Sequence, residues 1–128
     1  MPIMNETELL MKFIAEVPEH MPHVRVFRRT IINAEVEREG RRFRAVAGIK
    51  GQADSYALVT GGGHVEIETK AARGVMREAQ KAWRAQMLEM RIPHLVLRGK
   101  AGEHPAQTVE RWIAELRAAI LTIRAGVS

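Results

Sequence analysis

The sequence contains no cysteine, which excludes disulfide bonds, zinc–thiolate centres and cysteine nucleophiles. It also lacks any apolar run of about 18 residues and any signal-peptide pattern at its start. Serine occurs only at positions 55 and 128, so no Ser-His-Asp arrangement is indicated. We therefore expect a protein of the cytoplasm that is neither secreted nor inserted in a membrane, and that works without thiol or serine chemistry.

The 128 residues that are present fit one domain with a real hydrophobic core, because 46% of them are hydrophobic and 27% are charged. Lysine and arginine outnumber aspartate and glutamate by 20 to 15, which gives a formal net charge of +5. Such a surplus is compatible with a polyanionic partner but does not require one.

Hydrophobic periodicity predicts helices at 5–17, 74–90 and 105–123, with Pro18 ending the first. The segments "VRVFRRTIINAEV" and "EREGRRFRAVAG", residues 24–48, predict two strands with a turn at Glu39-Gly40. Further strands are predicted at 54–59, 65–70 and 94–98, and Gly61-Gly62-Gly63 is interpreted as a hairpin turn rather than a phosphate cradle. The order α-β-β-β-β-α-β-α predicts an α/β fold with one central mixed sheet flanked by helices.

The predicted hairpin at 54–70 carries charged residues in strands that are otherwise rich in apolar residues. Because side chains alternate between faces along a strand, Glu66, Glu68 and Lys70 project together. If the turn pairs Thr60 with His64, Asp54 lies opposite Lys70; if it pairs Thr60 with Gly62, Asp54 lies opposite Glu68. Either register brings Asp54, Glu68 and Lys70 within reach of one another.

Two convergent carboxylates repel each other unless a cation lies between them, and such hard oxygen ligands suit Mg²⁺ or Mn²⁺. A lysine beside them can hold a phosphate or orient an attacking water, so metal-assisted phosphodiester hydrolysis is one interpretation. The alternative is an ordinary solvated strand face, where alternating glutamate and lysine are common.

The predicted helix at 74–90 adds a basic stripe with Gln80 in the same row, opposite an apolar face that includes Val75, Ala79 and Trp83. The stripe, which lies close to the acids in sequence, consists of Arg73, Arg77, Lys81 and Arg84. It is interpreted either as a set of phosphate contacts or as a solvated helix face. Trp83 and Trp112 lie on apolar helix faces and are predicted to be core residues.

These residues together resemble the PD-(D/E)XK nuclease superfamily. Asp54 is followed after thirteen residues by Glu68-Thr69-Lys70, and Gln80 lies ten residues beyond Lys70. The segments "FRRTIIN", "GIKGQAD", "VEIETKAARG" and "REAQKAW" are similar to the virus-type replication-repair nuclease (VRR-NUC) family within it. The resemblance covers about residues 5–98 of a single 1–128 domain and leaves out the last helix. Ala53 departs from the proline of the family motif.

The resemblance implies a role for each matching residue. Asp54 and Glu68 would bind the metal ion, with the main-chain carbonyl of Thr69 as a further ligand. Lys70 would activate the water and stabilise the phosphate, and Gln80 would support the site. The acid of the first helix would be Glu8, with Glu6 as its rival; Glu8 is also the capping-box partner expected for Asn5. Arg28 or Arg29 would contact the nucleic-acid backbone.

The expected function is therefore that of a Mg²⁺- or Mn²⁺-dependent endonuclease acting on branched or duplex DNA, structure-selective or junction-cleaving, with a role in DNA repair. The resemblance places it in the cytoplasm of a bacterial or phage-infected cell. Cutting both strands needs two sites, so a homodimer is expected. The alternative is a nucleic-acid-binding module without catalysis, or a subunit of a larger nuclease complex.

Overall fold

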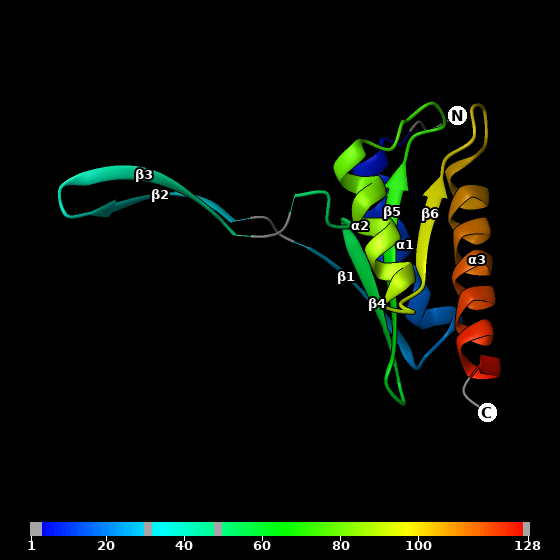
Figure 1. Cartoon of the computed structure of the whole chain (residues 1–128). Coiled ribbons are helices and arrows are strands. Elements are labelled where there is room, and N and C mark those ends of the chain that lie inside the picture. The colour runs from blue at the N-terminus through cyan, green and yellow to red at the C-terminus, as the bar shows by residue number, and fades with distance from the viewer. Residues whose placement is uncertain (1–3, 30–31, 48–49, 127–128) are drawn as a thin grey trace.

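The structure is a computed structural model that describes residues 4–29, 32–47 and 50–126. The elements in chain order are α1 (Glu6–His20), β1 (Val24–Arg28), β2 (Ile32–Arg38), β3 (Arg41–Ala47), β4 (Ser55–Val59), β5 (Gly63–Lys70), α2 (Glu78–Glu89), β6 (His94–Arg98) and α3 (Pro105–Gly126). They form an α/β fold in which helices flank a mixed sheet (Figure 1).

The main sheet has four strands in the order β1-β4-β5-β6. β1, β4 and β5 are antiparallel neighbours, whereas β6 is parallel to β5 and is connected to it through α2. β2 and β3 pair with each other as a separate hairpin, which projects away from the main sheet (Figure 1). The hairpin is inserted in the chain between β1 and β4, and the residues that border the insertion in the sheet, Arg28 and Ser55, are paired.

The hydrophobic core lies between the sheet and the helices α1 and α3. Alternating residues of β1, β4 and β5 point into it, and Phe13 and Trp112 contribute its largest side chains. Their rings meet edge to face with centroids 5.9 Å apart, a favoured aromatic geometry. Within the described part of the chain, no helix is both long and apolar enough to cross a membrane.

The prediction that Pro18 ends the first helix is wrong. α1 begins as expected, because the Asn5 side chain accepts a hydrogen bond of 2.8 Å from the Glu8 amide. The helix nevertheless continues through Pro18 to His20, and the Met21 amide still reaches the Val17 carbonyl at 2.8 Å. A proline removes one backbone donor, and so close to the end of a helix the remaining turn holds without it.

The predicted strand at 24–36 is also wrong in its extent, because it divides into β1 and β2, which belong to different sheets. The described residues therefore form one strand more than the predicted order, and the 32–47 segment lies outside the central sheet. The turn at Glu39-Gly40 is confirmed: both residues have positive φ, of 55° and 73°, which matches a tight hairpin turn. This local turn pairs β2 with β3 and leaves β1 to pair with β4.

The helix predicted at 74–90 begins four residues later, at Glu78. Gly74 instead takes part in a turn in which its amide donates to the Ala71 carbonyl at 2.9 Å. Val75, expected on the apolar face, is 76% exposed, and Met87 is the buried residue of α2. The helical spacing of Val75 was therefore misleading, because that residue precedes the helix.

The core prediction for Trp112 is confirmed, since its side chain is fully buried. Its indole nitrogen donates to the Arg98 carbonyl at 3.0 Å, which ties α3 to the end of β6. We expect Trp112→Phe to lower the free energy of unfolding by about 1–3 kcal/mol, because it removes this hydrogen bond and leaves part of the ring volume empty. Urea unfolding measures the change, and a midpoint equal to that of the wild type would contradict the core assignment.

Candidate functional site

The register of the β4–β5 hairpin decides which residue lies opposite Asp54. Val59 pairs with Gly63 and Ser55 pairs with Ile67, so the next position along the ladder places Asp54 opposite Glu68. This confirms the second of the two predicted registers. The Asp54 amide donates to Oε2 of Glu68 at 3.2 Å, which fixes the two residues side by side at the end of the hairpin.

The Asp54 carboxylate is held by the neighbouring strand. Its Oδ2 accepts from the Thr69 hydroxyl at 2.7 Å and from the Thr69 amide at 3.3 Å, and its Oδ1 accepts from the Ser55 hydroxyl at 3.2 Å. Burial raises the pKa of Asp54 above its ordinary value, although these hydrogen bonds and nearby Lys70 act in the opposite direction. The carboxylate is thus fixed in place but short of compensating positive charge.

Glu68 is in a similar position and is only 5% exposed. Its Oε1 accepts a hydrogen bond of 3.0 Å from the side-chain amide of Gln80 and lies 3.8 Å from Nζ of Lys70. Burial, and then repulsion from Asp54, raise the pKa of Glu68 to about 7. Two adjacent carboxylates with raised pKa values form a site in which a cation would be strongly stabilised.

Gln80 links the site to the start of α2. Its side-chain oxygen accepts from the Arg77 amide at 2.9 Å, while its amide nitrogen donates to Glu68. The same turn of α2 packs closely on the loop before β4: a β-carbon at Gly51, whose φ is +84°, would lie 2.2 Å from the Ala79 carbonyl oxygen. Glycine at position 51 therefore allows α2 to approach the strand end that carries Asp54.

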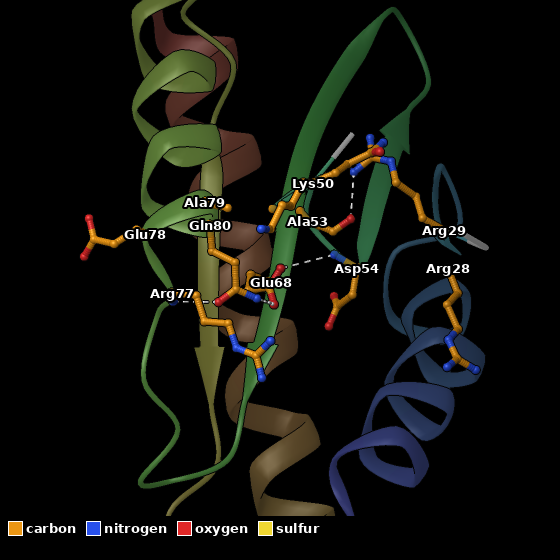
Figure 2. Close-up of a pocket in the computed structure, with 12 residues that line it drawn as sticks. Arg28, Arg29, Lys50, Ala53, Asp54, Glu68, Arg77, Glu78, Ala79 and Gln80 are labelled. Atoms are coloured by element: carbon orange, nitrogen blue, oxygen red, sulfur yellow. Dashed lines mark hydrogen bonds between the residues drawn. The ribbon is translucent and has the colours of Figure 1, made fainter. Parts of the chain in front are cut away.

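The two carboxylates open onto a pocket of about 690 Å³. Figure 2 shows Arg77 and Arg28 on opposite sides of the acids and the Glu78 side chain turned away from them. The residues lining the pocket are Arg28, Arg29, Lys50, Gly51, Gln52, Ala53, Asp54, Glu68, Arg77, Glu78, Ala79 and Gln80. A concave site with two acids and a basic rim can accept an anionic group.

The structure separates the two candidate acids of α1. Glu8 faces its own helix start, where its Oε1 accepts from the Asn5 side-chain amide at 3.0 Å. Oε1 of Glu6 instead lies 3.4 Å from the Thr69 hydroxyl, and its charge adds to the raised pKa of Glu68. Glu6, rather than Glu8, is therefore the helix acid beside the site, and Glu8 is the hydrogen-bonding partner of the N-cap residue Asn5.

The two candidate arginines also have different surroundings. Arg28 is exposed and lines the pocket. Arg29 is engaged inside the protein, where its guanidinium donates to both oxygens of Glu66 at 2.6 and 2.7 Å and to the Ala53 carbonyl at 3.1 Å. Its own amide donates to the Asp54 carbonyl at 2.8 Å. Arg29 thus positions the backbone around Asp54, and Arg28 is the one of the two whose side chain is exposed at the pocket.

The sequence pattern did not reveal the network around Glu66, which is 1% exposed. Besides Arg29, the His64 ring and the Trp83 indole contact its carboxylate, the latter at 3.0 Å. Burial raises the pKa of Glu66, but the hydrogen bonds from Arg29, His64 and Trp83 outweigh it and leave that pKa below its ordinary value. Trp83 is half-buried over this carboxylate and lies outside the main core, so its prediction as a core residue is wrong.

The predicted basic stripe does not lie on one helix face. Arg73 and Arg77 precede α2, and of the four residues only Arg77 lines the pocket. Lys81 is exposed and pairs with Glu78 at 3.3 Å, while Arg84 lies further along the exposed side of α2. The stripe was predicted on the assumption that all four residues belong to one helix. Because α2 begins only at Glu78, Arg73 and Arg77 are not part of it.

The donor set fits a hard divalent cation of the Mg²⁺ type. No group of three or more His, Asp or Glu side chains within residues 4–29, 32–47 and 50–126 is arranged to hold a metal ion. Mg²⁺, however, binds proteins through one or two carboxylates and retains several waters. The desolvated pair of Asp54 and Glu68 supplies that number, and the neighbouring pocket leaves room for water and a phosphate oxygen.

The raised pKa of Glu68 predicts a pH-dependent stability. Between its ordinary value of 4.5 and its folded value of about 7, the folded protein holds a proton that the unfolded chain releases. The contribution of Glu68 to the free energy of unfolding is therefore present at low pH and is lost as pH rises through about 7. Glu68→Gln should flatten this decline and make the metal-free protein more stable than the wild type at pH 8.

Urea unfolding in EDTA at pH 5 and pH 8, for wild type and Glu68→Gln, measures this difference. Exposed Glu78→Gln is the matched control, because it should follow the wild-type pH profile. An identical pH slope in Glu68→Gln and wild type would contradict the raised pKa.

Comparison with known proteins adds no further assignment: no protein-family model matches this chain, and no curated protein is significantly similar to it in sequence.

Proposed function

We propose that this protein is a divalent-metal-dependent endonuclease that hydrolyses phosphodiester bonds in DNA. The observation that carries the proposal is the convergence of Asp54 and Glu68, two desolvated carboxylates with raised pKa values, beside Lys70 and Gln80. Structural carboxylates are ordinarily neutralised by a bonded partner, as Glu66 is by Arg29. A pair left short of positive charge at the wall of a pocket is typical of a functional site.

Asp54 and Glu68 would hold a Mg²⁺ or Mn²⁺ ion, with the Thr69 carbonyl as a further ligand. When bound, such an ion polarises the phosphate and lowers the pKa of a coordinated water. Thr69 and Ser55 keep the Asp54 carboxylate oriented, and Gln80 does the same for Glu68. The site therefore needs little rearrangement to receive the ion.

Lys70 is the positively charged side chain next to the two carboxylates. Its Nζ lies 3.8 Å from Glu68, and its side chain is 14% exposed. From this position it can donate to a non-bridging phosphate oxygen and stabilise the charge that develops there, or orient the attacking water. Lys70 thus complements the acids without being fully neutralised by them.

The basic rim supports a nucleic acid as the substrate. Arg28, Lys50 and Arg77 line the pocket, and the chain as a whole has a net charge of +5. Such side chains would contact phosphates on either side of the cleaved bond, which favours recognition of the backbone over recognition of bases. One site cuts one strand, so we propose a homodimer for cleavage of both.

The test is incubation of the purified chain with supercoiled plasmid, a four-way junction, linear duplex and RNA. Each substrate is tested with Mg²⁺, Mn²⁺ or EDTA. We expect metal-dependent nicking or cleavage of DNA that EDTA abolishes. The absence of cleavage on every substrate with either metal would overturn the proposal.

A non-catalytic nucleic-acid-binding module, or a subunit of a larger nuclease, is the second candidate. This function needs no metal ion, and in the described parts of the chain no group of three or more His, Asp or Glu side chains is arranged to hold one. Salt-sensitive binding of DNA without cleavage under any metal condition would identify this function instead.

A further inference from the structure

A row of three rings crosses the sheet next to the candidate site. Phe27 of β1 and Tyr56 of β4 are paired in the sheet, and their ring centroids lie 5.5 Å apart at an interplanar angle of 28°. Tyr56 and His64 of β5 follow at 5.6 Å and 7°. Stacked rings on neighbouring strands form a continuous ladder that ends at Phe27, and β1 is the edge strand of this sheet.

The outer end of this ladder is exposed. α2 covers the β5 side of the same face, where Trp83 and Gln80 contact Glu66 and Glu68. Phe27, in contrast, is 44% exposed and Leu58 of β4 is 45% exposed. One face of the Phe27 ring is stacked on Tyr56, and no described strand lies beyond β1 to cover its other side.

The ladder is joined to the candidate site through Arg29. Its guanidinium lies 4.7 Å from the centre of the Tyr56 ring and donates to the carbonyl of Ala53, the residue before Asp54. Arg29 therefore contacts both the middle ring of the ladder and the backbone next to Asp54. Exposed Arg25, two residues before Phe27, lies on the same face of β1, whereas Arg28 directly after it alternates to the opposite face and lines the pocket.

We propose that Phe27 is a stacking platform for an unpaired nucleobase, and that the substrate is DNA with a single-stranded segment next to the cleaved bond. Any base can stack through its π face, but a base inside a duplex has both faces covered by its neighbours. Arg25, on the same face of β1 as Phe27, matches a phosphate of the same strand. This inference rests on the proposed function for its substrate, but the binding it describes needs no cleavage.

The test is fluorescence anisotropy with a labelled oligothymidylate and with a blunt duplex of the same length, both in EDTA. Phe27→Leu keeps an apolar side chain but removes the ring, and Phe27→Trp restores a larger one. We expect Phe27→Leu to bind the single strand about 5- to 100-fold more weakly, with duplex affinity unchanged and with binding regained in Phe27→Trp. Leu121→Ala, at an exposed apolar position of α3, is the matched control and should bind like the wild type.

Three outcomes would overturn the inference. The first is a single-strand affinity of Phe27→Leu equal to that of the wild type, and the second is an equal loss of affinity for the single strand and the duplex. A lower mass by light scattering in Phe27→Leu would show that this face joins copies of the chain. The proposed function fails separately: metal-dependent cleavage insensitive to Phe27→Leu refutes only the platform, and Phe27-dependent binding without any cleavage refutes only the nuclease.

Discussion

Replacement of Lys70 by alanine is expected to slow phosphodiester cleavage by about 100- to 1,000-fold, the usual cost of removing one group that stabilises developing charge. Among the described residues, Lys70 is the basic side chain that forms an ion pair with Glu68, and its Nζ lies 3.8 Å from Oε1. Its loss removes the donor that we propose for the phosphate. It also removes the positive charge that opposes the raised pKa values of Asp54 and Glu68.

Initial rates at saturating Mg²⁺ measure this effect, and thermal unfolding shows whether the variant is folded. Lys81→Ala is the matched control, because Lys81 is 58% exposed and pairs only with Glu78 among the described residues. It should cut at nearly the wild-type rate. A Lys70→Ala protein that is fully active would remove Lys70 from the chemistry.

The second large effect is expected on stability. Arg29→Met should lower the free energy of unfolding by about 3–5 kcal/mol, because it leaves the Glu66 carboxylate buried without its bidentate partner. It also removes the hydrogen bonds from the guanidinium to Glu66 and the Ala53 carbonyl. The substitution thus removes the contact that holds the backbone next to Asp54.

Urea unfolding of Arg29→Met and of Arg28→Met separates this anchor from general charge effects. Arg28 is exposed, so its replacement should change stability by less than about 0.5 kcal/mol. The double variant Arg29→Met with Glu66→Gln should recover part of the loss, since the uncompensated charge is gone. A single Arg29→Met variant as stable as wild type would show that the ion pair contributes nothing.

The same anchor predicts how this loss depends on pH. The pKa of Glu66 lies below its ordinary value in the folded protein, so its pairing stabilises the fold above that ordinary value and the stabilisation is lost as pH falls. The difference between wild type and Arg29→Met should therefore shrink in acid. Unfolding at pH 3 and pH 7 measures it.

Much of the hairpin could be predicted because its rules are local. Strand alternation and a glycine turn limit the register to two choices, and both brought Asp54 close to Glu68 and Lys70. The fully buried Trp112 followed from a long, regular apolar stripe. These predictions depended on residues near each other in sequence.

The remaining features depend on contacts between distant residues. The pairing of Arg29 with Glu66 joins the residue after β1 to β5, and alternation alone shows only which face Glu66 occupies. The start of α2 was misplaced because Val75 has helical spacing, whereas Gln80 sets the first turn through the Arg77 amide. The break between β1 and β2 was hidden because β-branched residues continue across it.

The contact between Gly51 and Ala79 restricts which sequences can carry this fold. A β-carbon at position 51 would overlap the backbone of α2, so no choice of rotamer on a neighbouring side chain can relieve it. At Gly61 a β-carbon would meet no atom within 4 Å, so the restriction there comes only from its φ of +98°, which asparagine tolerates better than other residues. A library randomised at both positions and selected for folding would thus return glycine at position 51 and a mixture at position 61.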